Sequence, residues 1–160
     1  MEKFVDWFES QSERQGLQIV KKLIKEEKLD WANWLLPRLM EYKDYVAYAI
    51  YATELVLPIF EKRYPDDDRP RKTIEATKVC LEDPSNENKK KVCNAADAVV
   101  FGCKSAFYAA NAAVDAAIAA DRDAPFGCEN AANSSGYAAT AKKEMLLKIL
   151  QYGIKLLEGK

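Results

Sequence analysis

The sequence predicts an all-α protein, a single-domain helical bundle or helical stack of about six to eight helices around alanine-rich central helices. Alanine fills eighteen of the forty-seven positions from Ala95 to Ala141, and it is the best helix former because it loses no side-chain entropy in a helix. Charge is nearly absent from Ala95 to Ala120, whereas a surface helix normally carries a broad charged face. We therefore expect these helices to lie at the centre, covered by neighbours on most sides.

Length and charge limit the class of protein. A chain of 160 residues fits one domain, in which residues 1–40, with all three tryptophans, supply bulky packing against a helical core at residues 41–160. The 24 basic and 25 acidic side chains are interspersed, so neither the basic face of a nucleic-acid binder nor the acidity of a nucleic-acid mimic is present. No apolar run approaches the roughly 18 residues that span a bilayer. We expect a cytoplasmic protein that contacts neither nucleic acid nor membrane.

Histidine is absent from the sequence. This absence excludes Ser–His and Cys–His nucleophiles, imidazole metal ligands and Glu-x-x-His di-iron sites. None of the four cysteines belongs to a Cys-x-x-Cys pair, which favours free buried thiols over zinc ligands or disulfides. We predict a protein that is not an enzyme and that has neither a cofactor nor a metal site.

Helical periodicity and prolines divide the first half of the chain into helical segments. Apolar residues recur every three or four positions within each segment, as on one face of a helix. Pro37 and Pro58 should shorten or restart the helices that contain them. The expected segments are Phe4–Glu9, Leu17–Ile24, Trp31–Met40 and Tyr42–Tyr64.

In the second half, Asp68 is a suitable N-cap for a helix whose first turn holds Pro70. The break at residues 83–85 ends that helix, and another break, at residues 123–127, carries a proline and a glycine typical of a turn. Between the two breaks the pattern predicts one long helix, and after the second it predicts two more. These three expected helices are Glu87–Asp121, Cys128–Lys142 and Glu144–Glu158.

A row of mainly small residues follows the long expected helix at alternating steps of four and three, as in a heptad pattern. We expect this row to be among the least accessible surfaces of the molecule. A large residue in place of Ala106 or Ala110 should overpack it and cost about 1–3 kcal/mol. The row comprises Val92, Ala96, Val99, Cys103, Ala106, Ala110, Ala113 and Ala117.

Acidic and basic residues stand on both sides of the loop that precedes Pro70 in the sequence. An antiparallel return of the chain would bring them together, and we predict an internal, partly buried network in which at least one arginine pairs with Glu54 or Glu61. Removing one member of a buried pair should cost several kcal/mol. The alternative is a site where the arginines bind a partner or an anion. The residues concerned are Glu54, Glu61, Asp68, Arg69, Arg71 and Glu75.

Polar side chains interrupt the alanine-rich region at spacings of 7, 7 and 4, which would place them on one face of a single helix. They could line a polar pocket, or they could form the solvated edge of a nearly buried helix. The four residues are Asp97, Lys104, Asn111 and Asp115.

Three runs of sequence carry a resemblance to a known family. They are Trp31-Ala32-Asn33-Trp34-Leu35-Leu36, the run from Tyr48 to Glu61, and Arg69-Pro70-Arg71-Lys72-Thr73-Ile74-Glu75-Ala76. With the alanine-rich helices that follow, they resemble the immunity-five-like family of bacterial toxin-immunity proteins over roughly residues 31–141. The resemblance implies an all-helical protein that neutralises a toxin by binding it. Relatives often carry histidines in the alanine-rich helices, so no histidine-dependent activity would transfer to this chain.

Together these observations favour a non-enzymatic inhibitor that occupies the surface of another protein, a toxin or a nuclease. One alternative is an inhibitor encoded by a mobile element and aimed at a host defence nuclease. A second alternative, from another class, is a small-ligand-binding protein or enzyme with a Glu/Arg pocket. Assembly of several copies of the chain is compatible with each of them.

Overall fold

A computed structural model confirms the all-helical class. It describes residues 2–102, 108–122, 125–138 and 141–159, and every regular element within these ranges is a helix. The number of helices exceeds the six to eight expected. In the order of the chain they are α1 (Glu2–Glu9), α2 (Gly16–Lys25), α3 (Leu29–Leu35), the 3-10 helix η1 (Leu36–Leu39), α4 (Tyr42–Glu54), α5 (Leu57–Arg63), α6 (Arg69–Glu82), α7 (Asn86–Gly102), α8 (Tyr108–Arg122), α9 (Pro125–Ala138) and α10 (Lys142–Glu158).

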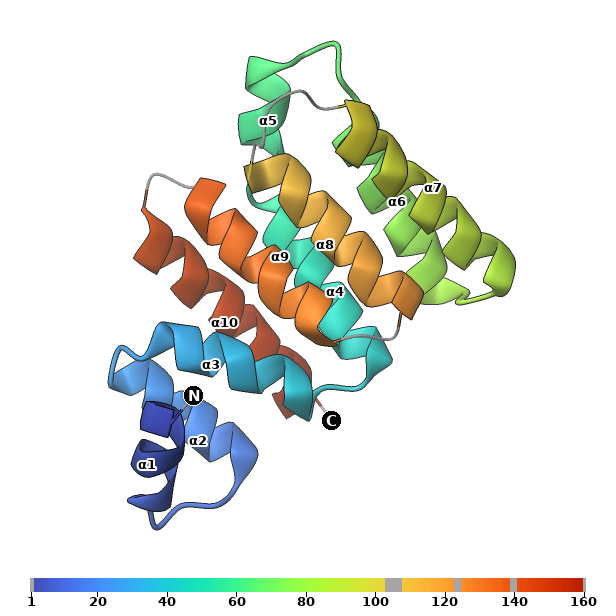
Figure 1. The fold of residues 1–160 in the computed structure, drawn as a ribbon. Helices are drawn as coiled ribbons and strands as arrows, with labels where there is room; N and C mark the ends of the chain where they lie inside the picture. The colour runs from blue at the N-terminus through green and yellow to red at the C-terminus, as the bar shows by residue number, and fades with distance from the viewer. Residues whose placement is uncertain (1, 103–107, 123–124, 139–140, 160) are drawn as a thin grey trace.

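The helices are arranged around α4, α8 and α9, which all pack against one another (Figure 1). Helices α6 and α7 cover one flank of this centre, and α10 covers the other. The N-terminal helices lie beyond α10, where α2 and α3 contact it. Within the described ranges, none of the helices combines the length and the apolar character needed to cross a bilayer.

Prolines set several helix boundaries where the sequence predicts them. Pro37 lies in η1, where the α3 helix gives way to a 3-10 turn, and Pro58 lies in the first turn of α5, which restarts after α4. Pro70 lies in the first turn of α6. Proline has no N–H to donate and its φ suits a first helical turn, so these positions begin helices.

The prediction of a single long helix over Glu87–Asp121 is wrong. Helix α7 ends at Gly102, and α8, which starts at Tyr108, packs against α7. One straight helix could not make that contact. Folding back lets the apolar faces of both helices be buried.

The expected turn at residues 123–127 is wrong for residues 125–127, because α9 already begins at Pro125 and Gly127 lies in its first turn, while Asp123 and Ala124 lie outside the described residues. The glycine serves close packing. A Cβ atom at Gly127 would lie 2.7 Å from the backbone nitrogen of Ala119 and 2.8 Å from the carbonyl oxygen of Asp115. Helices α8 and α9 therefore meet backbone to backbone.

The expected central position of the alanine-rich helices is confirmed for α8 and α9 and is wrong for α7, which lies on the outer flank and leaves Asp97, Ala98 and Val100 exposed. On α8, the alanines at 112, 113, 116, 117, 119 and 120 are buried, as are Ala131 and Ala132 on α9. In the heptad-like row, Val92, Ala96 and Val99 are buried on α7. Cys103, Ala106 and the side chain of Ala110 lie outside the described part, so the overpacking prediction is not tested there.

Candidate binding pocket

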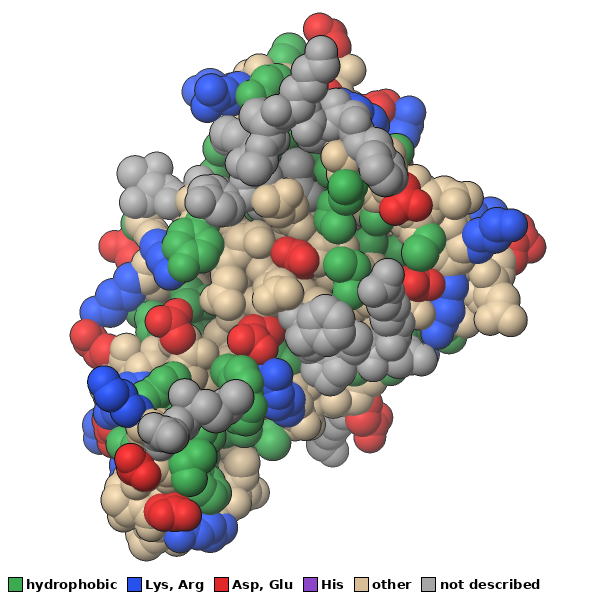
Figure 2. Space-filling view, viewed as in Figure 1, with side chains coloured by type: hydrophobic (Ala, Val, Ile, Leu, Met, Phe, Trp, Pro, Cys, Tyr) green, Lys and Arg blue, Asp and Glu red, His purple; other side chains and the backbone are tan. Residues whose placement is uncertain are grey.

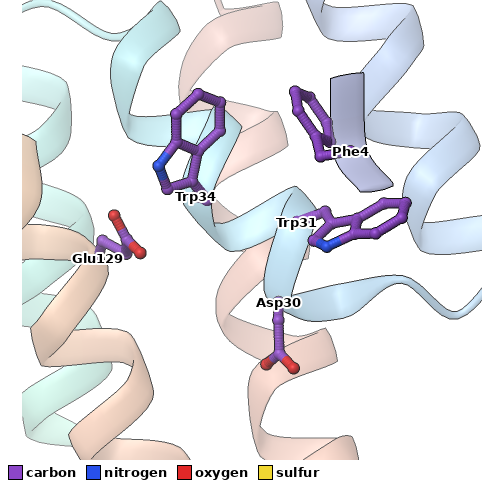
Figure 3. A pocket seen from close by; sticks show the side chains of 5 residues that line it. All are labelled: Phe4, Asp30, Trp31, Trp34 and Glu129. Carbon is purple, nitrogen blue, oxygen red and sulfur yellow. The ribbon is translucent and has the colours of Figure 1, made fainter. Parts of the chain in front are cut away.

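A pocket of about 230 Å3 opens at the surface between α1, α3 and α9. Trp31 and Trp34 lie three residues apart and therefore share one face of α3, and Phe4 comes from α1 (Figure 3). The ring of Phe4 contacts both tryptophans, with centroid distances of 5.6 Å to Trp31 and 5.3 Å to Trp34. Asp30 and Glu129 complete the lining. The result is an aromatic hollow with a carboxylate at two of its edges.

The aromatic rings are only half-buried because α1 lies at the edge of the molecule. Its Phe4, Trp7 and Phe8 rings pack mainly against one another and against the tryptophans of α3. Figure 2 shows hydrophobic side chains at the surface over α1 and α3, with acidic and basic side chains around them. This part of the surface is aromatic and bears charges of both signs.

Two basic side chains of the protein lie over these rings. The Arg38 guanidinium lies 4.2 Å from the centroid of Trp34, and its Nη1 is 3.0 Å from a carboxylate oxygen of Glu129. The Lys28 ammonium lies 5.9 Å from the ring of Trp31 and pairs with Glu26. A cation over an indole face is attracted by the negative face of the ring.

A buried asparagine holds the two sides of the pocket in place. Asn33 is fully buried beside Trp34, and its Oδ1 accepts a hydrogen bond from the hydroxyl of Tyr48 at 2.8 Å. Its Nδ2 donates to the carbonyl oxygen of Glu129 at 3.0 Å and to Oδ1 of Asn133 at 3.1 Å. Buried polar groups of this kind fix geometry because a lost partner leaves a costly unsatisfied atom. Asn33 thus ties α3 to α4 and α9 directly behind the pocket.

The predicted Glu/Arg cluster forms in part. Arg71 donates from Nε and Nη2 to the two carboxylate oxygens of Glu61, the second at 2.8 Å. The prediction that one arginine pairs with Glu54 or Glu61 is therefore confirmed. This hydrogen bonding lowers the pKa of Glu61. Arg69 pairs instead with Asp67, with Nε donating at 2.7 Å.

The remaining members of the cluster do not join one network. Glu54 pairs with Lys78, and Glu75 is exposed on α6 and acts on Arg71 only through its charge. Asp68 occupies the N-cap position of α6, but its side chain makes no capping hydrogen bond and pairs with Lys72 at 2.9 Å. Asp68 therefore stands at the predicted N-cap position, but its side chain does not make a capping hydrogen bond.

We expect the Glu61–Arg71 pair to contribute less than about 1 kcal/mol, and not the several kcal/mol of a buried pair. The side chain of Arg71 is 43% exposed and that of Glu61 is 34% exposed, and solvent screens pairs of this kind. A double-mutant cycle with Glu61→Ala and Arg71→Ala, followed by urea unfolding, measures the coupling. A coupling above about 2 kcal/mol would contradict this assignment.

The prediction that the four polar residues share one face of a single helix is wrong. Asp97 lies exposed on α7, whereas Asn111 and Asp115 lie on α8, because the expected long helix is two helices. Lys104 lies outside the described residues. Asp115 is half-buried and its Oδ2 accepts a hydrogen bond from Ser134 at 3.1 Å. Its burial raises the pKa of Asp115 from 3.8 to about 6.

Other hollows are less suited to a specific ligand. One of about 160 Å3 between α7 and α8 is mostly apolar, and at its edge Cys93 donates to Asp121 at 3.3 Å. Another, of about 580 Å3, lies open at the loop of residues 63–69, where Arg69 and Asp67 already pair. Among the residues that the structure describes, no three His, Cys, Asp or Glu side chains are grouped to hold a metal ion.

No family model, curated protein or solved structure matches the chain. The pocket itself was not identified from the sequence, since Phe4 and Glu129 are far apart along the chain. The available signal was the Trp31-Ala32-Asn33-Trp34 run, in which two large rings share a face with a polar residue beside them.

Proposed function

We propose that this protein is a non-enzymatic inhibitor that neutralises a partner protein by occupying its surface, as a toxin-immunity protein does. The observation that carries the proposal is the surface pocket of Phe4, Trp31 and Trp34 with carboxylates at its edges. Tryptophan, tyrosine and arginine dominate the binding energy of protein interfaces. Here two tryptophans and Arg38 lie together at one place on the surface.

The size of the pocket favours a protein partner over a metabolite. Small-molecule sites usually enclose about 300–1,000 Å3, whereas this pocket has about 230 Å3. A volume of this size suits one anchoring side chain from a partner. The sequence also contains no histidine, the side chain that enzymes use most often for proton transfer, and this favours binding over catalysis.

The experiment is a survival assay combined with a binding measurement. The chain is co-expressed with each toxin candidate that sequencing finds beside its gene, and the affinity of the purified pair is measured by calorimetry. We expect the chain to restore growth, and we expect Trp34→Ala to weaken binding by about 30-fold, as for a central interface residue. Tyr137→Ala is the matched control, because Tyr137 is an exposed aromatic residue outside the pocket.

Equal losses of affinity in the Trp34 and Tyr137 variants would refute the role of the pocket. Relief of a host nuclease defence, without rescue from the neighbouring toxin, would support the mobile-element inhibitor instead. A tightly bound metabolite in the purified protein, with no protein partner, would support the small-ligand alternative.

A further inference from the structure

The lining of the aromatic pocket indicates which kind of side chain it takes. Its walls are three rings whose faces attract cations, and both carboxylates at its edges carry negative charge. Glu129 is already paired with Arg38. Asp30 is exposed at the pocket, and no ion pair among the described residues involves it, although it also lines a second hollow with Lys142 and Lys143.

We propose that the pocket binds a lysine side chain of the partner protein, with its alkyl stem against Trp31 and Trp34 and its ammonium group at Asp30. The inference rests on the proposed function in taking the partner to be a protein. In Figure 3, Asp30 lies on the side of Trp31 away from Phe4 and its carboxylate points away from the rings, so the ammonium group would meet it at the rim of the pocket.

Lysine suits this pocket better than arginine. A guanidinium is planar and binds best to a carboxylate that it can engage through two hydrogen bonds, whereas an ammonium is a compact charge on an apolar stem. Here the carboxylate of Glu129 and one side of Trp34 are already taken by Arg38. What remains is an apolar hollow that ends at a single carboxylate, which matches an alkylammonium.

The walls of the pocket are also fixed in place before a ligand binds. Asn33 fixes the backbone of α9 at Glu129 against α3 at 3.0 Å, and the Phe4 ring closes the end toward α1. When the walls of a site do not rearrange, less of the interaction free energy is lost in ordering side chains on binding.

The test is an NMR titration of the full chain with Nα-acetyl-lysine methylamide. We expect the indole N–H signals of Trp31 and Trp34 to shift and saturate in the millimolar range. The Trp7 indole donates to Glu26 at 2.8 Å and does not line the pocket, so its signal should stay in place. The Nε-acetylated, neutral form of the ligand should bind at least five-fold more weakly.

Two variants test the role of the carboxylate. Asp30→Asn keeps the shape of the side chain and should weaken binding of the lysine derivative by roughly five-fold, the loss of about one exposed charge pair. Asp6→Asn, an exposed acid on α1 outside the pocket, should leave binding unchanged.

Several outcomes would overturn the inference. They are the absence of saturable shifts at Trp31 and Trp34, equal binding of the neutral ligand, an unchanged affinity in Asp30→Asn, and tighter binding of the matching arginine derivative. These outcomes are distinct from failure of the proposed function. Lysine binding without any protection from the toxin would refute the proposed function alone, and protection without lysine binding would refute this inference alone.

Discussion

Replacing Gly127 with alanine is expected to lower the free energy of unfolding by about 3 kcal/mol. The new Cβ would lie 2.7–2.8 Å from backbone atoms of Ala119 and Asp115. Backbone atoms of a packed helix cannot turn aside as a flexible side chain can, so α8 and α9 would have to separate. That separation would loosen the buried alanine contacts on both helices. Urea unfolding followed by circular dichroism measures the change.

Gly136→Ala is the matched control on the same helix. The nearest atom to a Cβ there would be Cγ of the Lys142 side chain, at 3.3 Å, and this side chain can move, while the carbonyl oxygen of Lys142 lies at 3.9 Å, an ordinary contact distance. Alanine is better than glycine inside a helix by roughly 0.5–1 kcal/mol, so the control should be neutral or slightly more stable than the parent. If both variants unfold alike, the close approach of α8 and α9 is wrong.

Replacing Asp115 with asparagine is expected to raise the free energy of unfolding by about 2 kcal/mol at pH 7. The pKa of Asp115 is raised by burial from 3.8 to about 6, so the folded protein binds this proton more tightly than the unfolded chain. The stability that it contributes is full below about pH 4 and is lost as the pH rises through 6. At neutral pH a half-buried charge therefore opposes folding, and a neutral amide does not.

The pH dependence separates this effect from a general change in packing. The gain of the Asp115→Asn variant should be small at pH 4 and vanish at about pH 3, below both pKa values, where the carboxyl is protonated in both states. The amide oxygen can still accept the hydrogen bond from Ser134. Asp97→Asn is the control because Asp97 is exposed and its replacement should change stability little at either pH. A gain that is the same at pH 4 and pH 7 would contradict the assignment.

The predictable part of the fold came from local chemistry. Proline constrains its own backbone and that of its neighbour wherever it stands, so Pro37, Pro58 and Pro70 mark boundaries that need no knowledge of the rest of the chain. Alanine abundance likewise indicates central helices, because a helix with so little charge has no broad solvated face. This is correct for α8 and α9 but not for α7, which lies on the outer flank.

The parts that failed depend on contacts between helices. Within an alanine-rich run nothing local distinguishes a helix that continues from one that folds back, so the reversal of the chain between α7 and α8 could not be predicted. Gly127 looks like a turn residue in sequence, and only the backbone of α8 beside it explains the glycine. The binding pocket joins Phe4, the α3 tryptophans and Glu129 across the chain, a proximity that no periodicity encodes.

The position of the three tryptophans has a consequence for how the protein can be observed. Trp7 lies on α1, and Trp31 and Trp34 lie on α3, so indole emission originates entirely from one end of the molecule. Far-ultraviolet circular dichroism, in contrast, weights all helices by their length. The two signals therefore follow different parts of the protein, and their coincidence during denaturation would demonstrate that the aromatic end unfolds together with the alanine-rich centre as one cooperative unit.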